Sequence, residues 1–380
     1  MRRLLGNLAL AATATAGTLL TMELVLRVAG YAPEAFRHTE RVANGRRTLL
    51  LDCYPTNPRG YFDIDLRDPA TRRRYREQGV ARVDDVARHT PFALERRYNS
   101  ARFRGPEIPA KAPGLRRVVV IGDSFTEGMG VREEDVYPRV LHRTLNGRSK
   151  VGEWEVLNCG RRGYDFPALG DLFEEVLDLG PDVVVYGMVL NDPEQTEDFA
   201  SRQVELNDWI LDRSRMRRDA RTGPGLLESR LASLVRDRLE RQRVARETER
   251  WYRGMYSAPN RQGWERTQSR LREMNRRMQE RGGRLLVALW PLLAGLEGRY
   301  PFEDLSQTIS EFCLTAGIPF YDLAVPLRGH RSDTLWVHPI DHHPNEIAHR
   351  LAAESLAPVI RRQLTPRPDH GTSERQFGDT

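Results

Sequence analysis

The amino-acid sequence predicts an α/β protein built on a parallel, doubly wound sheet. Short apolar runs rich in β-branched residues recur along the chain, and such unbroken runs are typical of strands buried on both faces of a parallel sheet. Helical patterns alternate with these runs, which favours crossover helices stacked on both faces of the sheet. The five predicted strands are residues 118–121, 154–157, 183–188, 285–290 and 319–323.

Helices are predicted between these strands at residues 135–145 and 166–179, and a closing helix is predicted at 345–360. A stretch rich in Pro, Gly, Asn and Arg precedes the alternation, and we expect it to pack beside the main domain as an irregular lead-in. The C-terminal residues are polar and contain prolines, which predicts disorder. The predicted divisions are an N-terminal anchor or signal peptide at 1–30, the lead-in at 31–113, the main domain at 114–362 and a disordered tail at 363–380.

A long insertion after the third predicted strand interrupts the alternation at about residues 195–282. It holds charged helical segments such as 226–235, where leucine and valine recur at helical spacing, so that one face would pack and the other would meet water. The insertion could cap a site at the end of the third strand, or it could pack without touching a substrate. The sequence favours neither interpretation.

The N-terminal segment predicts a membrane anchor. Two arginines follow Met1 and precede residues 4–22, which carry no charge and end at Glu23. A run of this length is just sufficient to span a bilayer, and the arginines would hold the N-terminus in the cytoplasm. The small residues at 14–16 make a cleavable signal peptide the alternative, but the apolar character continues to Leu26 and favours an uncleaved anchor. Either interpretation exports the main domain.

The charge pattern argues against a nucleic-acid partner. The chain has 380 residues, of which 29% are charged, and its formal net charge is +6. The excess comes from arginine, because lysine occurs only at Lys111 and Lys150. The arginines are mixed with acidic residues throughout rather than gathered with aromatic residues, as a nucleic-acid surface would require. We therefore interpret them as a solvated surface.

The three cysteines indicate neither a disulfide framework nor a zinc site. Cys53, Cys159 and Cys313 are odd in number, widely spaced and without a C-x-x-C pair. We expect packed thiols, with one disulfide between two of them as the alternative outside the cytoplasm.

A serine at the end of the first predicted strand is the first candidate for chemistry. Residues 118–121 run directly into Gly122, Asp123 and Ser124. Ligands of parallel α/β sheets bind at the carboxyl ends of the strands, so Ser124 would stand where a nucleophile is useful. Taken alone, these residues are also typical of an ordinary turn.

Three further segments supply the partners that a serine nucleophile needs. Gly163 follows the second strand in a glycine-rich turn, where the backbone can approach a ligand closely. Asn191 follows the third strand and offers a side-chain amide. Asp341 and His343 lie just before the closing helix and offer a carboxylate and a base.

Together these segments resemble the conserved blocks of the SGNH/GDSL hydrolase family, in their usual order. The N-terminal anchor and residues 99–105 are also similar to membrane-anchored or exported bacterial members of that family. The resemblance implies a flavodoxin-like doubly wound sheet and ester hydrolysis without a metal or cofactor. The matching blocks are G-D-S at 122–124, N-x-G-x-x-G at 158–163, N-D at 191–192 and H-P-N at 343–345.

The resemblance also implies roles for individual residues. Ser124 would be the nucleophile, His343 the general base, and Asp341 the carboxylate that orients the imidazole. The oxyanion hole would consist of the backbone N–H groups of Ser124 and Gly163 and the side-chain amide of Asn191.

The chain departs from the family pattern at the carboxylate. The family usually places aspartate three residues before the histidine, where this chain has Ile340, and Asp341 lies two residues before His343. A two-residue offset could still reach the ring from a turn. Asp123 and Asp192 are expected to fix their loops rather than to react.

Other histidines compete with His343 for the role of base. His338 also precedes a proline but lacks the following Asn and helix, His342 would point away from its neighbour in an extended segment, and His349 is expected to be packed or to act as a cap in the closing helix. The cluster of His338, Asp341, His342 and His343 permits a zinc or manganese site as an alternative. No H-E-x-x-H helix supports that alternative.

The sequence therefore predicts an exported, membrane-tethered serine hydrolase that cleaves carboxylic esters through an acyl-enzyme. An esterase, a lipase-like enzyme and a carbohydrate deacetylase all fit, and the ester could belong to an envelope glycan or lipid at the periplasmic or cell-surface side. One alternative keeps the same Ser-His-Asp site but transfers the acyl group to a hydroxyl of an envelope glycan. Another is a non-catalytic envelope scaffold or glycan-binding module.

Overall fold

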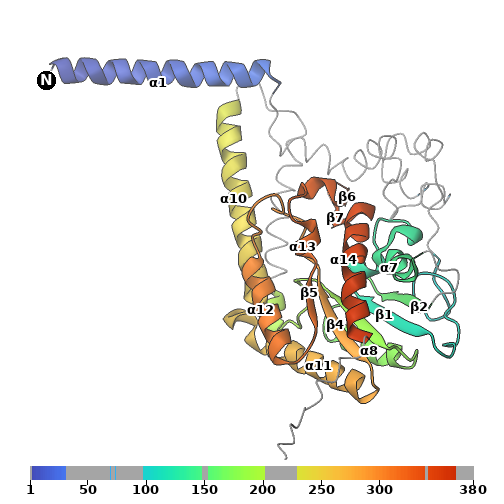
Figure 1. The fold of residues 1–380 in the computed structure, drawn as a ribbon. Coiled ribbons are helices and arrows are strands. Elements are labelled where there is room, and N and C mark those ends of the chain that lie inside the picture. Colours follow the sequence, from blue (N-terminus) through green and yellow to red (C-terminus); the bar gives the residue numbers. More distant parts are fainter. Residues whose placement is uncertain are drawn as a thin grey trace, which may run out of the picture.

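The computed structural model of the protein describes residues 2–30, 97–147, 153–201, 229–338 and 341–364, with the single residues Pro69 and Arg73. Its centre is a five-stranded sheet in the order β2-β1-β3-β4-β5, and every neighbouring pair is parallel (Figure 1). This is the strand order of a flavodoxin-like doubly wound fold, so the predicted fold class is confirmed. The strands are β1 (Arg116–Gly122), β2 (Trp154–Gly160), β3 (Val183–Met188), β4 (Arg284–Leu289) and β5 (Phe320–Asp322).

The central strands β1 and β3 form the interior of the molecule. Every residue of β3 is buried, as is every residue of β1 after Arg116. Their register sets Val118 opposite Val183 and Val120 opposite Val185, so β-branched side chains lie side by side across the sheet. Burial on both faces explains why these strands have continuous apolar sequences.

Helices cover both faces of this sheet. On one face, α7 (Tyr137–Asn146) packs against the closing helix α14 (Glu346–Leu364). On the other, α8 (Ala168–Leu177) packs against α11 (Arg261–Glu280), and α12 (Glu303–Thr315) joins them through an edge contact between Trp264 and Phe312. The short elements are α6 (Ser124–Glu127), η1 (Glu133–Asp135), η2 (Ala258–Asn260), α13 (Ala324–Leu327) and η3 (Ser332–Thr334).

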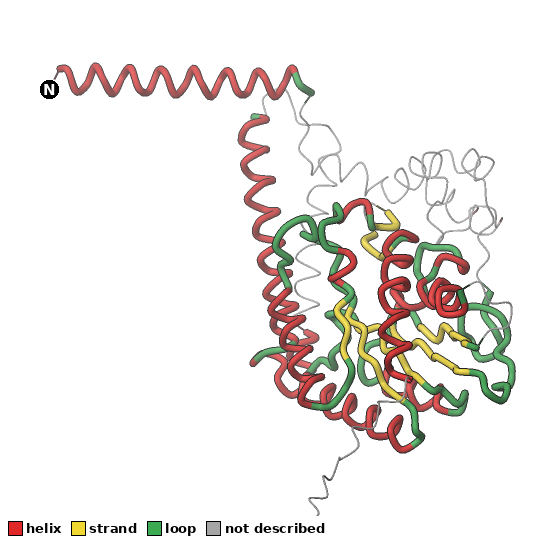
Figure 2. The backbone as a smooth tube through the Cα atoms, in the orientation of Figure 1, coloured by secondary structure: helices red, strands yellow, loops and turns green. Residues whose placement is uncertain are grey.

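Besides a short helical segment at residues 197–201 and η2, two long described helices follow β3 within the segment predicted as an insertion. The second, α11, packs against β4 and therefore serves as the ordinary crossover helix between the third and fourth strands. The first, α10 (Arg230–Met255), is the additional element, and it extends away from the sheet toward the N-terminal helix α1 (Arg2–Val28), as Figures 1 and 2 show. Residues 202–228 of the predicted insertion lie outside the described residues.

A short antiparallel hairpin precedes the closing helix, and the sequence analysis did not predict it. It consists of β6 (Trp336–His338) and β7 (Asp341–Pro344). Its strands are only three and four residues long, and β7 (D-H-H-P) has no apolar alternation. Such a segment has no strand pattern of its own.

The described end of the lead-in lies against the main domain. Tyr98 and Arg104 form an isolated antiparallel bridge, and the Asn99 side chain accepts a hydrogen bond from Phe103 N at 2.9 Å. Phe103 and Arg104 are buried. Most of the lead-in, residues 31–96 apart from Pro69 and Arg73, and the tail beyond Leu364 lie outside the described residues, so the predicted division at residue 113 and the predicted disorder stay predictions.

Within the described residues, one helix, Arg3–Val28, has the length and composition that a membrane span requires. Cys159 and Cys313 are free, buried thiols, as expected. Burial raises the pKa of Cys313 to about 12. Cys53 lies outside the described residues.

Candidate active site

Three glycines at the ends of neighbouring strands allow the helix that carries Ser124 to pack closely against the sheet. Gly122 of β1 pairs in register with Gly160 of β2 and with Gly187 of β3, which forms a row without side chains across the sheet. A Cβ atom at any of the three would overlap Thr126 of α6. The glycines therefore allow α6 to lie directly on the carboxyl edge of the sheet, with Ser124 as its first residue.

Asp123 fixes the start of this helix. Its side chain is the N-cap of α6 and accepts a hydrogen bond from Phe125 N at 2.9 Å. Burial raises the pKa of Asp123 to about 6, while the bond from Phe125 and the nearby His343 act in the opposite direction. The expected role of Asp123 in fixing its loop agrees with these contacts.

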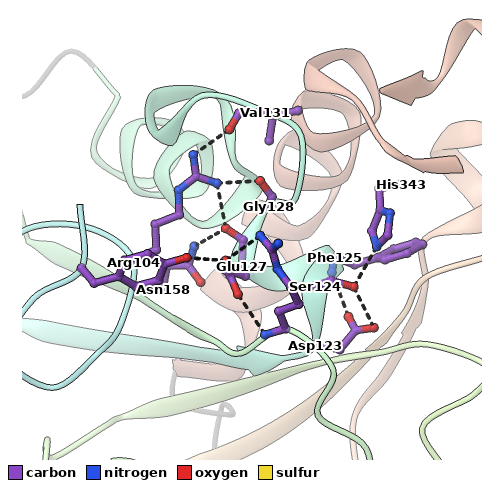
Figure 3. A network of polar contacts seen from close by, with 11 residues as sticks. Arg104, Asp123, Ser124, Phe125, Glu127, Gly128, Val131, Asn158 and His343 are labelled. Carbon is purple, nitrogen blue, oxygen red and sulfur yellow. Dashed lines mark hydrogen bonds and ion pairs between the residues drawn. The ribbon is translucent and has the colours of Figure 1, made fainter. Parts of the chain in front are cut away.

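Ser124 and His343 come together although they are 219 residues apart. Ser124 Oγ lies 2.8 Å from His343 Nε2 and 3.5 Å from Asp123 Oδ2. When Nε2 is unprotonated, the serine hydroxyl donates to it, which is the geometry of a nucleophile and its base. The His343 ring also packs against Phe125, with 5.2 Å between ring centroids. Figure 3 shows Asp123, Ser124 and His343 gathered on one side of α6.

The β6/β7 hairpin explains which histidine reaches the serine. Successive side chains of a strand point to opposite faces, so His343 and His342 of β7 point in different directions. His342 is exposed and stacks on Trp336, with 3.8 Å between ring centroids. His342 therefore points away from Ser124, as expected for an extended segment.

Asn345 joins the hairpin to the closing helix. Its Oδ1 accepts hydrogen bonds from the backbone N–H groups of Ile347 and Ala348, at 3.0 and 3.2 Å. Its Nδ2 donates to the carbonyl oxygens of Thr334 and Trp336, at 2.8 and 3.2 Å. The amide thus caps α14 and also binds the β6 side of the hairpin, so the asparagine of the H-P-N block has a structural role.

Of the remaining candidate histidines and the candidate carboxylate, only His349 has a described side chain. His349 is fully buried, accepts a hydrogen bond from Tyr137 N at 3.2 Å and stacks on the Tyr137 ring, so it is packed as expected. The side chains of His338 and Asp341 lie outside the described residues. Among the described residues no three His, Cys, Asp or Glu side chains are placed to share a metal ion.

Gly163 occupies a tight turn at the end of β2. Tyr164 N donates to Arg161 O at 3.2 Å, and Arg161 N donates to Gly122 O at 2.9 Å, which ties the turn to the end of β1. Gly163 has a φ of +76°, in the left-handed region, and a Cβ atom there would meet nothing within 4 Å. Backbone conformation, and not lack of space, therefore requires glycine at this position.

Asn191 lies half-buried in the loop after β3. The neighbouring Asp192 fixes this loop, because its buried carboxylate accepts from Tyr186 Oη at 2.6 Å and from Val189 N at 2.8 Å. Burial, together with the charge of Asp123, raises the pKa of Asp192 well above its ordinary value. Among the described residues no hydrogen bond joins Asn191 or Gly163 to Ser124.

Glu127, at the end of α6, was not singled out by the sequence analysis. Its buried carboxylate accepts from Tyr98 Oη at 2.8 Å, from Arg162 N at 2.9 Å and from the Arg162 guanidinium at 3.1 Å. Glu127 therefore connects α6 to the turn that contains Gly163. The sequence signal that could have identified it is an acidic residue three positions after Ser124.

Arg104 supports the same helix from the lead-in. Its guanidinium is buried and donates to the carbonyl oxygens of Glu127 at 3.2 Å, Gly128 at 2.5 Å and Val131 at 2.6 Å. These groups include carbonyls at the C-terminal end of α6, which have no partner within the helix. Figure 3 shows Arg104, Glu127 and Asn158 on the side of α6 away from His343.

Comparison with known proteins gives a family match and several distant structural likenesses. The model of the GDSL-like lipase/acylhydrolase family matches residues 120–351, which is more than half of the chain. No curated protein matches the chain.

Three solved structures illustrate these likenesses. An acetylxylan esterase from Geobacillus stearothermophilus is 14% identical, with 66% of this chain and 95% of that chain covered and a TM-score of 0.38. A carbohydrate acetylesterase family member from Sinorhizobium meliloti is 17% identical, with 66% and 99% covered and a TM-score of 0.36. An alpha/beta hydrolase from the metagenome of Lake Arreo, Spain, is 17% identical, with 64% and 94% covered and a TM-score of 0.39.

Proposed function

The chain belongs to the GDSL-like lipase/acylhydrolase family, and from this premise we propose that it is a serine hydrolase that cleaves carboxylic esters through an acyl-enzyme. The observation that carries the proposal is the 2.8 Å contact between Ser124 Oγ and His343 Nε2 at the carboxyl edge of the sheet. A serine hydroxyl is a weak nucleophile at neutral pH and needs such a base.

In the proposed reaction, Ser124 Oγ attacks the carbonyl carbon of the ester while His343 Nε2 takes the hydroxyl proton. The bond to the alcohol oxygen then breaks, and His343 returns the proton to that oxygen as the alcohol leaves. Water repeats the sequence in reverse, with His343 again as the base, and releases the acid. No step requires a metal ion or a cofactor.

The developing oxyanion would meet the backbone N–H groups of Ser124 and Gly163 and the side-chain amide of Asn191. Donors fixed in advance stabilise the charge most effectively. The support for this assignment is that all three follow neighbouring strands of the sheet, and that the Asp192 and Glu127 carboxylates hold two of the loops in place.

We assign the orienting carboxylate to Asp341. The family spacing of three residues suits a carboxylate that lies on a turn, whereas residues 341–344 of this chain form the extended strand β7. Residues two apart in a strand share one face. The spacing of two between Asp341 and His343 therefore suits a strand.

The proposed location is the outer side of a membrane, with α1 as the anchor. Its support is the apolar helix Arg3–Val28, which contains no fully buried residue. An anchored hydrolase of this kind would act on ester groups of envelope glycans or lipids.

The test uses the full-length protein in detergent and compares wild type with Ser124→Ala and His343→Ala. We expect wild type to hydrolyse short-chain aryl esters and to react with a fluorophosphonate probe, and both variants to lose turnover and labelling. Equal labelling of wild type and Ser124→Ala would sink the proposal, as would wild-type protein that neither labels nor turns over.

The acyltransferase alternative uses the same residues and differs in the group that receives the acyl chain. Wild-type protein is supplied with an acetyl donor and a glycan acceptor, and the products are identified by mass spectrometry. Free acetate alone supports the hydrolase, whereas an acetylated glycan that forms only with intact Ser124 favours the transferase.

A further inference from the structure

Glu23, the only acidic residue of α1, closes the N-terminus of α10. Its carboxylate accepts from the backbone N–H groups of Arg230 and Leu231, both at 2.9 Å, and from the Ser229 hydroxyl at 3.0 Å. The first turn of a helix leaves such N–H groups without partners, and the helix dipole favours a negative charge there. Arg27, one turn further along α1, pairs with the same carboxylate at 2.7 Å. A distant residue of the anchor therefore caps α10.

This junction leaves an apolar groove of about 710 Å³ between the two helices. Leu19 and Leu20 line it from α1, and Leu231, Val235 and Leu239 line it from α10. Leu19 and Leu20 lie near the C-terminal end of the uncharged run 4–22, which would span the bilayer. The α10 side chains that face them would therefore lie at the outer end of this run. Val235 and Leu239 are 51% and 58% exposed, which is unfavourable for apolar side chains in water.

The arrangement of the helices indicates how α10 would lie. α10 runs roughly perpendicular to α1 (Figures 1 and 2). The N-terminal part of α1 lies on one side of α10, and the sheet domain lies on the other. A helix that crosses the outer end of a spanning helix follows the plane of the bilayer surface. From the groove, an exposed stripe continues along α10 at helical spacing, through Val235, Leu239, Gln242, Arg246 and Arg250.

The composition of this part of α10 fits a negatively charged surface. Residues 230–246 contain six arginines and two acidic residues. Anionic headgroups attract arginines on a helix that lies in a membrane interface.

We propose that α10 lies on the surface of the bilayer that α1 spans, with Val235 and Leu239 among the acyl chains and the arginines among anionic headgroups. The proposal rests on the proposed anchoring by α1 and is independent of the chemistry at Ser124. One consequence concerns the site: Tyr256, just after α10, donates to Leu190 O at 3.0 Å, next to Asn191. The surface helix thus connects the membrane to a loop of the candidate active site.

The experiment places a fluorophore on single introduced cysteines of the full-length protein in vesicles of phosphatidylcholine and phosphatidylglycerol. The positions are Val235→Cys on α10, Leu10→Cys within α1, and Leu314→Cys on α12, an apolar residue that is 81% exposed away from the groove. All variants also carry Cys53→Ser, and the protein with that change alone, whose Cys159 and Cys313 are buried, serves as the labelling blank. Quenching by lipids that carry a doxyl group reports contact with the acyl chains.

We expect strong quenching at Leu10→Cys and Val235→Cys and none at Leu314→Cys. We also expect the Val235 signal to weaken without phosphatidylglycerol and in the double variant Arg243→Glu, Arg246→Glu. Quenching at Leu10 without quenching at Val235 would overturn the proposal and indicate that another part of the chain fills the groove. If Leu10 is not quenched, the anchoring and this proposal both fail, while ester hydrolysis by the same sample decides the proposed chemistry separately.

Discussion

The carboxylate of Glu127 and the backbone of Arg162 join the helix of the candidate nucleophile to the turn of the candidate oxyanion donor. The two atoms, Glu127 Oε2 and Arg162 N, are 2.9 Å apart. Gly163 is the next residue of that turn, so the position of its N–H relative to Ser124 depends on this contact.

Glu127→Ala should lower kcat by about tenfold or more, because a small displacement of a catalytic donor is costly, and should leave KM nearly unchanged. Glu127→Gln keeps an acceptor for Arg162 N and should recover part of the rate. Steady-state kinetics on an aryl ester measure both. Glu175→Gln, which removes a carboxylate paired with Arg161 at the surface, is the control and should behave as wild type. Equal kcat values for wild type and Glu127→Ala would refute the positioning role.

Gly163→Ala separates backbone strain from function. The left-handed φ of +76° should cost an alanine about 1–2 kcal/mol of stability, with no steric clash. Gly282 is the matched control: its φ is +74°, and a Cβ atom there would also meet nothing within 4 Å. It lies far from the site residues in sequence, and Gly282→Ala should cost similar stability. Urea unfolding and kcat are measured for both variants. We expect kcat to fall only for Gly163→Ala, and a similar fall in both variants would contradict the assignment.

Asn191→Ala should lower kcat by about 10²- to 10³-fold if its amide stabilises the oxyanion. Asn275 is the matched control, because its buried amide donates to Ala316 O at 3.3 Å within α11 packing. Asn275→Ala should reduce the free energy of unfolding but not kcat. An unchanged kcat in Asn191→Ala would remove this residue from the site.

Asp341→Asn should lower kcat by about 10²- to 10⁴-fold, because an asparagine stabilises neither the required tautomer nor the imidazolium. Fluorophosphonate labelling of Ser124 should slow in parallel. Asp333→Asn, a change to an exposed residue paired with Arg331 just before the hairpin, is the control. Wild-type kinetics in Asp341→Asn would show that Asp341 is not the orienting carboxylate.

His349 makes stability depend on pH. Burial lowers its pKa to about 3 from an ordinary value of 6.5. Between these values the unfolded chain binds a proton that the folded chain does not, so stability falls as the pH drops below 6.5, by about 1.4 kcal/mol per unit. His349→Asn keeps an acceptor for Tyr137 N and should remove this slope, with His330→Asn as the exposed control. Urea unfolding between pH 7 and pH 5 gives the slopes, and identical slopes for wild type and His349→Asn would exclude this origin.

The five strands of the sheet could be predicted because each is a local pattern. A parallel strand buried on both faces must be apolar along its whole length, as residues 183–188 are. Ser124 and His343 could be identified as candidates from motif order, and the structure brings them within 2.8 Å of each other. The hairpin before the closing helix escaped prediction because its strands, three and four residues long, are too short to show an alternating pattern.

By itself, the sequence determined the order of strands and helices, the apolar N-terminal helix and the residues available for chemistry, since all of these follow from side chains near one another in the chain. Only the tertiary structure decided which of these residues meet. The pairing of Gly122, Gly160 and Gly187 beneath α6, the Glu127 contact with Arg162, and the capping of α10 by Glu23 join residues that are far apart in sequence. No local propensity encodes such contacts, because their partners become neighbours only when the sheet and its helices have packed.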